Sequence, residues 1–373
     1  MDRALGRVPR RVAVTGTRGK SGVTRLVAAG LRASGARVLA KTTGSKPVLI
    51  FPDGTEREIA RTGPASIREQ IRLAALAASI GADTLVAEMM SIGGECLAAE
   101  SRSILRPGTL VVTNVRLDHL DAMGRDRASI ARTLASAVPP RAEVFIPAEE
   151  ADPAFAAAAA RRRATVRPVA RGAEGSDRPP LGGFEPNLRL ARAVLASLGV
   201  DPRTAESGMA AAAPDPGALR LWRGGFGRPP RPAVCLNLFA ANEPDSSAAS
   251  LRAVEEACPF AGRPLVGVLS LRQDRGDRTL QWIGAARQGF FRGFAAVALI
   301  GPGAPAALGR FRRAAGEDGP TVALVEAACP EVIMDRVMAL APAEPVIVGL
   351  GNFVGPGEDL VRFWDRTGAA HAG

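Results

Sequence analysis

The chain has 373 residues, of which 47% are hydrophobic, and this suffices for two domains that each bury a core. Its four widely spaced cysteines form no CxxC pair and it has only two histidines, which excludes a disulfide framework and a Cys/His zinc site. No run of about 18 apolar residues is present, and residues 1–11 lack the apolar centre of a signal peptide, so we expect a cytoplasmic protein.

The net charge of +11 suits an anionic partner or substrate. The lack of tyrosine, the aromatic content of 4% and the lack of a recognition module argue against nucleic acid and favour an acidic substrate. Only three of the 48 basic residues are lysine, and Lys20, Lys41 and Lys46 all lie in the first 46 positions. Because a guanidinium does not replace a compact ammonium at a crowded phosphate site, this clustering favours such a site near them.

The first predicted elements are a strand at 12–15 and a helix at 21–33, whose apolar residues recur at helical spacing. The loop between them has the glycines, lysine and hydroxyl of a phosphate-binding loop (P-loop): Gly16, Thr17, Arg18, Gly19, Lys20, Ser21 and Gly22. Lys20 would reach the terminal phosphates and Ser21 would offer its hydroxyl to Mg²⁺. Val14 stands where the full pattern has a first glycine, so a glycine turn that binds nothing stays open as an alternative.

A second strand is predicted at 38–40, and it runs into the polar segment 41–47. Lys41, Thr42 and Thr43 would lie at the carboxyl end of this strand, where open α/β sheets bind ligands, and would suit the anionic groups of a substrate. The alternative is a polar hairpin loop that leads into the strand 48–51 and a turn at 52–54.

The third buried strand, 84–87, ends in Glu88 and follows a helix that a capping box at Ser66 to Glu69 is predicted to begin. A carboxylate at the tip of a strand beside a P-loop can ligate Mg²⁺ directly or through water. Glu88 as a plain strand terminator is the alternative. A fourth strand, 109–112, precedes a polar stretch with Asn114, Asp118, His119 and Asp121. An isolated histidine is usually structural, but beside Glu88 and the P-loop we expect a metal or phosphate role for His119.

The rest of the chain divides into a connection, a helix and a second α/β unit. Residues 147–183 read as a short alanine helix, a strand at 165–169 and an exposed connection. A helix is predicted at 187–198, and from 262 onward strands alternate with helices, which implies a parallel sheet. Its first strand precedes three arginines suited to gripping carboxylate or phosphate, namely Arg272, Arg275 and Arg278. We therefore predict domains at 1–261 and 262–373, with 147–183 as a variable connection.

Several strings together resemble the Mur-type ATP-dependent amide ligases, and most closely the family of the poly-γ-glutamate synthase ligase subunit (PgsB/CapB). They are TGTRGKSGVTRL from Thr15, AKTTGS from Ala40, TNVRLDHLDAMG from Thr113, GMAAAAPDPG from Gly208, FAANEPDS from Phe239 and QDRGDR from Gln273. The resemblance covers nearly the whole chain except 147–183. It implies a P-loop ATPase domain with a parallel sheet, like the central domain of Mur ligases, and a smaller Rossmann-like α/β domain.

The resemblance also implies a reaction and roles for single residues. It implies ATP-dependent formation of γ-glutamyl bonds through an acyl phosphate, with Lys20 and Arg220 at the transferred phosphate. Ser21, Glu88 and His119 would hold Mg²⁺, and Asn187 is similar to an asparagine that touches adenine. Glutamate or a γ-glutamyl chain would be the substrate. Membrane-protein partner subunits and a homo-oligomer would both be compatible with the resemblance. Many Mur ligases hold a second Mg²⁺ on a carbamylated lysine, but this chain has no lysine after Lys46.

The sequence excludes one other function class and leaves two open. A GTPase is excluded because its N-K-x-D motif needs a lysine in a part of the chain that has none. A P-loop kinase for an acidic small molecule and a non-catalytic binder of acidic polymer both stay open. Amide formation on addition of glutamate would separate the ligase from the kinase, and ATP turnover would separate it from the binder.

Overall fold

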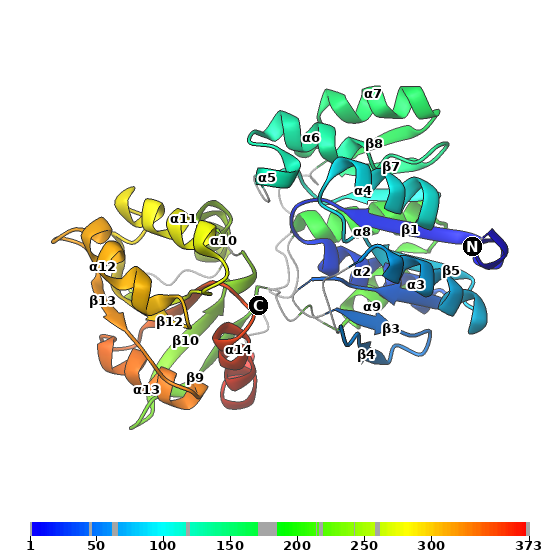
Figure 1. Ribbon diagram of the computed structural model, residues 1–373. Helices are drawn as coiled ribbons and strands as arrows, with labels where there is room; N and C mark the ends of the chain where they lie inside the picture. The colour runs from blue at the N-terminus through cyan, green and yellow to red at the C-terminus, as the bar shows by residue number, and fades with distance from the viewer. Residues whose placement is uncertain are drawn as a thin grey trace. The chain divides into compact units, whose positions relative to one another are not determined.

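The computed structural model describes residues 2–44, 47–61, 66–116, 120–170, 185–213, 215, 219–241, 243–257 and 262–370. It forms two compact units, of which the first contains the described residues up to Asp215 and the second those from 219 onward (Figure 1). The second unit begins before the predicted boundary at 262. The reason is that strands β9 (Leu221–Phe226) and β10 (Arg231–Asn237) belong to the second sheet, where β10 pairs with β14 (Val346–Gly351).

The first unit is built on an eight-stranded sheet in the order β4-β3-β2-β5-β1-β6-β7-β8. Its strands from β2 to β8 in this order run parallel, and β3 and β4 are antiparallel at one edge. The strand bounds are β1 Arg10–Thr15, β2 Val38–Lys41, β3 Val48–Ile50, β4 Glu56–Glu58, β5 Thr84–Glu88, β6 Thr109–Val112, β7 Glu143–Pro147 and β8 Thr165–Val169.

Helices cover both faces of this sheet because its strands bury both sets of alternate side chains. Val12 and Val14 of β1 enter one apolar cluster, and Ala13 enters the other. The Val12 cluster includes residues of α2, α8 and α9, and the Ala13 cluster includes residues of α3, α4, α6 and α7. The helix bounds are α1 Asp2–Gly6, α2 Lys20–Ala33, α3 Arg68–Ser79, α4 Gly94–Ala98, α5 Leu120–Met123, α6 Arg127–Ala135, α7 Pro153–Arg162, α8 Glu185–Ser197 and α9 Pro202–Ala210, with a π-helix η1 (Ala99–Leu105) and a 3₁₀-turn η2 (Ala148–Glu150).

The predicted capping box is wrong, because Glu69 makes other contacts. The N-cap of α3 is Ile67, without a side-chain hydrogen bond, and the Ser66 hydroxyl accepts from the Arg68 amide at 3.3 Å. Glu69 turns instead to Arg61 and Lys41. The predicted strands at 84–87, 109–112 and 165–169 and the alanine helix are present.

The second unit has a seven-stranded sheet in the order β13-β12-β11-β14-β10-β9-β15. The predicted parallel core is confirmed, with β9 and β15 antiparallel at one edge. The remaining bounds are β11 Leu265–Ser270, β12 Phe294–Ile300, β13 Thr321–Leu324, β15 Ala369–Ala370, η3 Phe239–Ala241, α10 Pro244–Ala257, α11 Gly276–Arg287, α12 Ala304–Ala315, α13 Pro330–Leu340 and α14 Pro356–Thr367.

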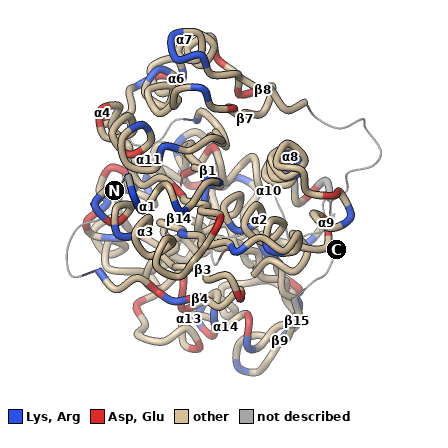
Figure 2. Tube along the Cα trace, turned by 90° about the vertical axis from the view of Figure 1, so that its right-hand side faces the viewer, with Lys and Arg blue, Asp and Glu red and all other residues tan. Residues whose placement is uncertain are grey.

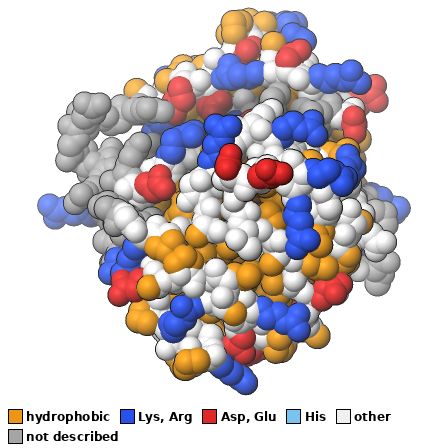
Figure 3. All heavy atoms as spheres, turned by 90° about the vertical axis from the view of Figure 1, so that its left-hand side faces the viewer, with side chains coloured by type: hydrophobic (Ala, Val, Ile, Leu, Met, Phe, Trp, Pro, Cys, Tyr) orange, Lys and Arg blue, Asp and Glu red, His pale blue; other side chains and the backbone are white. Residues whose placement is uncertain are grey.

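The surface charge is dispersed. Lys and Arg are spread along the trace in Figure 2, and basic side chains stand among acidic and neutral ones on the face shown in Figure 3. In the predicted variable connection, Arg167 is exposed and pairs with Glu143 at 3.0 Å. Within the described ranges, no helix combines the length and the apolar character that crossing a membrane requires.

Candidate active site

The loop between β1 and α2 has the backbone of a phosphate-binding loop. Gly16 (φ 123°) and Gly19 (φ 75°) both adopt the left-handed region that disfavours a side chain. Gly19 is the N-cap of α2, so the amides of the first helical turn and the positive end of the helix dipole border the loop. The Lys20 ammonium donates to the carbonyls of Gly16 (2.9 Å) and Thr17 (3.4 Å). The chain thus places one cation and a helix N-terminus at the same turn.

We expect Gly16→Ala to weaken ATP binding by about tenfold or more, because a strained loop costs about 1–3 kcal/mol. A Cβ on Gly16 would lie 2.2 Å from Thr113 Oγ1 and 2.9 Å from the Thr113 amide nitrogen, so the loop and the end of β6 would have to separate. Gly35→Ala is the matched control, since Gly35 also has positive φ (88°) but its Cβ would meet nothing within 4 Å. Titration calorimetry with ATP checks this, and equal affinities of the two variants would contradict it.

The residues after β6 support the P-loop directly. The Thr113 hydroxyl donates to the Arg18 carbonyl (2.5 Å), and Asn114 Nδ2 donates to the same oxygen (3.1 Å). Asn114 Oδ1 accepts from the Thr17 hydroxyl (2.5 Å) and from the Arg18 amide (3.0 Å). Asn114, one of the polar residues that follow this strand, thus uses its side-chain amide to hold the loop. Asp118 and His119 lie outside the described residues.

Ser21 and Glu88 meet at the carboxyl ends of neighbouring parallel strands. The Ser21 hydroxyl donates to Glu88 Oε2 (2.8 Å), and the Thr43 amide donates to the same oxygen (2.7 Å). Glu88 is 2% exposed, and its backbone carbonyl accepts from Gln70 Nε2 at 3.0 Å. A hydroxyl and a carboxylate are the hard oxygen ligands that Mg²⁺ takes from proteins, together with phosphate and water. This pair therefore fits the predicted magnesium position.

Metal sites built wholly from side chains are a different matter. Among the residues that the structure describes, no group of three or more His, Cys, Asp or Glu side chains could hold a metal ion. Mg²⁺ at nucleotide sites ordinarily needs only one or two carboxylates, because the phosphates supply further ligands. The Ser21–Glu88 pair is of this kind.

Lys41 and Thr42, predicted to contact substrate, point into the protein instead. Lys41 is 1% exposed and its ammonium lies 3.0 Å from Glu69 Oε2. Burial lowers the pKa of Lys41, and the bond to Glu69 offsets this in part. The Thr42 hydroxyl accepts from the Val48 amide at 3.3 Å, inside the hairpin. The sequence could not separate the two alternatives for this segment. The structure favours the hairpin, and the Thr43 backbone amide donates to Glu88.

The ion pair of Glu69 predicts an acid-dependent stability. Burial raises the pKa of Glu69, but hydrogen bonds from Arg61 and Lys41 outweigh it and lower that pKa from 4.5 to about 2. A carboxyl group whose pKa is lower in the folded than in the unfolded protein stabilises the fold at pH values above its unfolded pKa. This contribution is lost as the pH falls through the folded pKa. The free energy of unfolding of wild type should exceed that of Glu69→Gln near neutrality, and the gap should close between about pH 4.5 and about pH 2. A pH-independent gap in urea unfolding would contradict this.

Asn187, predicted to contact the nucleotide, lies against the P-loop. A Cβ built on Gly19 would sit 2.9 Å from the Asn187 amide atoms, and one on Gly22 would sit 3.5 Å from Asn187 Nδ2. Asn187 Oδ1 is buried and accepts no hydrogen bond from the residues that the structure describes. An unmet buried acceptor beside the loop fits a ligand that brings an N–H or O–H donor.

The predicted arginines all belong to the second unit. Arg220 is paired with Asp365 (Nη1 to Oδ2, 3.2 Å), and its guanidinium lies 4.8 Å from the centre of the Trp222 ring. Arg272, just after β11, donates to Asp274 at 2.8 Å, and Arg275 is the N-cap of α11. Arg278 lies in the first turn of that helix. All three arginines thus follow the carboxyl end of β11 along the chain, and their contact with substrate stays a prediction.

A cavity of about 390 Å³ lies beside the middle and end of α2, away from its P-loop end. Arg25, Arg32, Asp53 and Glu56 are its charged lining residues. Arg25 and Glu56 form an ion pair, and Asp53 accepts from the Thr55 hydroxyl and amide. The charged residues that line the cavity thus balance one another, and none of the predicted site residues lines it. The candidate active site is therefore placed at the P-loop and not in this cavity.

Known proteins match both units of the chain. The Mur ligase middle domain matches residues 14–167, and the poly-gamma-glutamate synthase CapB C-terminal domain matches residues 226–367. A capsule biosynthesis protein CapB of Bacillus anthracis is 32% identical over 288 residues, which are 75% of this chain and 61% of that protein. The chain thus spans less than two thirds of that relative. The PGA synthase CapB of Bacillus subtilis is 32% identical over 282 residues, 74% of this chain and 70% of that protein.

A solved structure agrees on the fold. The bifunctional folylpolyglutamate synthase/dihydrofolate synthase of Yersinia pestis, complexed with AMPPNP and a Mn ion, has a TM-score of 0.68 at 17% identity. The similarity covers 98% of this chain and 91% of that one. The fold predicted from the sequence resemblance is thereby confirmed. Because both domains are matched, and because the chain is 32% identical over 282 residues to a relative of which it covers 70%, it belongs to the CapB family, within the Mur ligase superfamily.

Proposed function

We propose that this chain is an ATP-dependent ligase that joins glutamate to a γ-glutamyl acceptor and releases ADP and phosphate. The observation that carries the proposal is the P-loop with Lys20 beside the Ser21–Glu88 pair, because a phosphoryl-transfer site needs a cation for the terminal phosphate and oxygens for Mg²⁺. The relatives named for capsule and PGA synthesis support γ-glutamyl chemistry. The solved relative named with AMPPNP and Mn supports ATP and a divalent ion.

In the proposed reaction, an oxygen of the acceptor's γ-carboxylate attacks the γ-phosphorus of ATP, and ADP leaves. The amine of the incoming glutamate, having lost a proton, then attacks the carbonyl carbon of the acyl phosphate. Phosphate leaves with the oxygen that the carboxylate supplied, so the atoms balance. Activation of this kind is needed because a carboxylate is a poor electrophile at neutral pH.

The chain's own residues would act mainly on charge. Lys20 and the amides at the start of α2 would bind the terminal phosphates, and Asn187 would hold the nucleotide through its unmet acceptor. Ser21 and Glu88, with His119 as predicted, would hold Mg²⁺, which supplies charge neutralisation to the phosphate oxygens. Arg220 would neutralise charge on the transferred phosphate. The carboxylates of the substrate would accept hydrogen bonds from Arg272, Arg275 and Arg278.

The relatives' names also bear on partners and location. Since one relative is named for capsule biosynthesis, an extracellular material, a membrane-protein partner that receives the polymer fits the proposal. ATP is a cytoplasmic substrate, so we place the reaction on that side of the membrane.

The test measures ADP release from ATP and Mg²⁺ with and without glutamate and short γ-glutamyl peptides, with mass spectrometry of the products. The proposal expects ADP and amide product in equal amounts, both dependent on glutamate. A phosphorylated product without an amide would identify a kinase. Binding of polyglutamate that weakens with salt, without ATP turnover, would identify a non-catalytic binder.

A further inference from the structure

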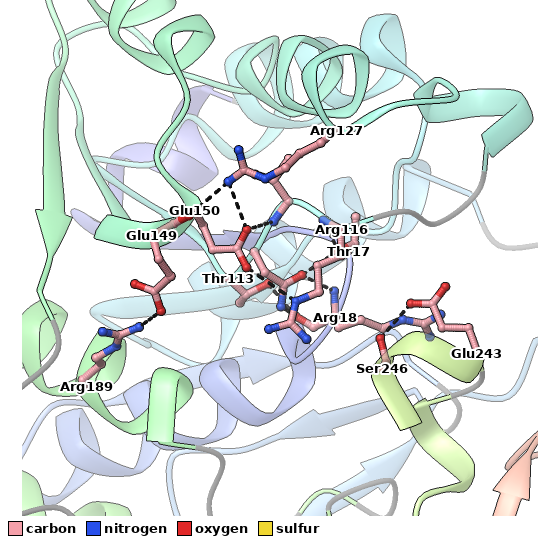
Figure 4. Close-up of polar contacts among 12 residues, drawn as sticks. Thr17, Arg18, Thr113, Arg116, Arg127, Glu149, Glu150, Arg189, Glu243 and Ser246 are labelled. Atoms are coloured by element: carbon pink, nitrogen blue, oxygen red, sulfur yellow. Dashed lines mark hydrogen bonds and ion pairs between the residues drawn. The ribbon is translucent and has the colours of Figure 1, made fainter. Parts of the chain in front are cut away.

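Two adjacent glutamates on the 3₁₀-turn η2, just after β7, reach two different segments that border the P-loop (Figure 4). Glu150 binds the segment that follows β6, and Glu149 binds the first part of α8. Neither residue belongs to the predicted site, and η2 falls in the stretch that the sequence analysis treated as a variable connection. Their contacts nevertheless lead to two segments that each contact the loop.

Glu150 is 9% exposed and acts as an acceptor for the loop after β6. It accepts from the Val115 amide (3.1 Å), from Arg116 Nε (3.5 Å) and from Arg127 Nη2 (3.4 Å). The Arg116 amide in turn donates to the Thr17 hydroxyl of the P-loop at 3.2 Å. The Glu150 carboxylate thus holds the segment at Val115 and Arg116, and the Arg116 amide of this segment donates to the P-loop.

Glu149 forms an ion pair with Arg189 of α8, and Arg189 is 6% exposed. Arg189 lies two positions after Asn187, whose side chain rests against Gly19 and Gly22. Apolar residues such as Leu190 and Val194 pack α8 on the sheet, and the Glu149–Arg189 ion pair adds a directional, charge-assisted contact to this packing. The ion pair therefore fixes the first turns of α8, where Asn187 sits.

We propose that Glu149 and Glu150 are positioning residues for the nucleotide, which set the two borders of the P-loop from one turn. This rests on the proposed function, because it assumes that ATP occupies the loop. A site must be held to within about 0.5 Å by its supporting contacts to bind well, and buried charged hydrogen bonds give that support. Loss of either glutamate then weakens ATP binding without touching a group that contacts ATP.

The experiment measures the dissociation constant of ATP with Mg²⁺ by titration calorimetry. Glu149→Gln, Arg189→Met and Glu150→Gln are each expected to weaken binding by about tenfold, as loss of a supporting contact does at other sites. Glu149→Gln with Arg189→Met should be no worse than the weaker-binding single variant, because both remove one interaction. Arg189→Lys, which keeps a positive charge for Glu149, should recover part of the affinity.

The chain offers matched controls for both glutamates. Arg192 and Glu206 form a second Arg–Glu pair that also starts from α8, and both are more exposed than the Arg189 pair. Glu143 begins the same strand, β7, and pairs with Arg167. Arg192→Met, Glu206→Gln and Glu143→Gln should keep ATP affinity within about twofold of wild type, since surface pairs carry little energy.

Melting temperatures of all variants are measured first, and titrations run below the lowest of them. Should Arg189→Met not fold, Glu149→Gln decides, because Glu149 is 34% exposed and the glutamine that replaces it has the same size. Wild-type affinity in Glu149→Gln and Glu150→Gln, or equal losses in the controls, would overturn the inference alone. If wild type itself bound no ATP, the proposed function would fall, and the inference with it.

Discussion

Replacing Lys20 with alanine should lower kcat/KM for glutamate-dependent ADP release by about 10²–10³-fold, the cost of removing one preorganised charge from a transition state. The Lys20 ammonium already lies over the carbonyls of Gly16 and Thr17, at the turn where the terminal phosphates would bind. Its loss leaves the developing phosphoryl charge without the ammonium that the loop holds at this turn. Steady-state kinetics with a coupled ADP assay measures the effect.

Lys20→Arg is the informative companion to this variant. A guanidinium is planar and larger than an ammonium, so it should not restore the rate even though the charge is kept. In a chain with 45 arginines and three lysines, this would explain in physical terms why lysine occurs at this position. Near-normal activity in Lys20→Ala would show that the phosphates bind elsewhere.

Glu88→Gln should lower activity by about 10²-fold at a fixed Mg²⁺ concentration, the scale on which removing one charged stabilising group acts. The glutamine oxygen can still accept from the Ser21 hydroxyl and the Thr43 amide, so the fold and both hydrogen bonds are kept. Only the negative charge that attracts the cation is removed. The activity of the variant should therefore recover in part as Mg²⁺ is raised, which a Mg²⁺ titration at saturating ATP detects.

Glu95→Gln, an exposed carboxyl on α4, is the control for Glu88→Gln and should titrate with Mg²⁺ as wild type does. If Glu88→Gln had the same Mg²⁺ dependence as this control, Glu88 would be a strand terminator and the metal would lie elsewhere. The two readings of Glu88 left open by the sequence are thus separated by one titration.

The sequence could predict the P-loop and its neighbour because both depend on local patterns. A strand, three glycines and a helix follow one another along the chain, and Glu88 ends a strand with β propensity. To predict that Ser21 and Glu88 meet, one further rule was needed, namely that the carboxyl ends of parallel strands lie at the same edge of a sheet. The structure agrees with this rule, because β1 pairs with β5 in parallel. Both steps use spacing alone.

Other features depend on contacts between residues far apart, which spacing does not encode. Lys41 looks like a ligand in the sequence because nothing there shows that Glu69 will pair with it in the interior. The domain boundary was misplaced because the β9–β10 hairpin has no signal that tells which sheet it joins. Glu149 and Glu150 stood in an alanine-rich and arginine-rich stretch, where two glutamates read as ordinary surface charge.

The most direct test of the central claim follows an oxygen atom. A γ-glutamyl peptide labelled with ¹⁸O in its terminal γ-carboxylate is incubated with ATP, Mg²⁺, glutamate and the protein, and the released phosphate is examined by mass spectrometry. The account predicts one ¹⁸O atom in phosphate for each amide formed, because the carboxylate oxygen bonds to phosphorus before it leaves. Unlabelled phosphate alongside amide product would contradict it.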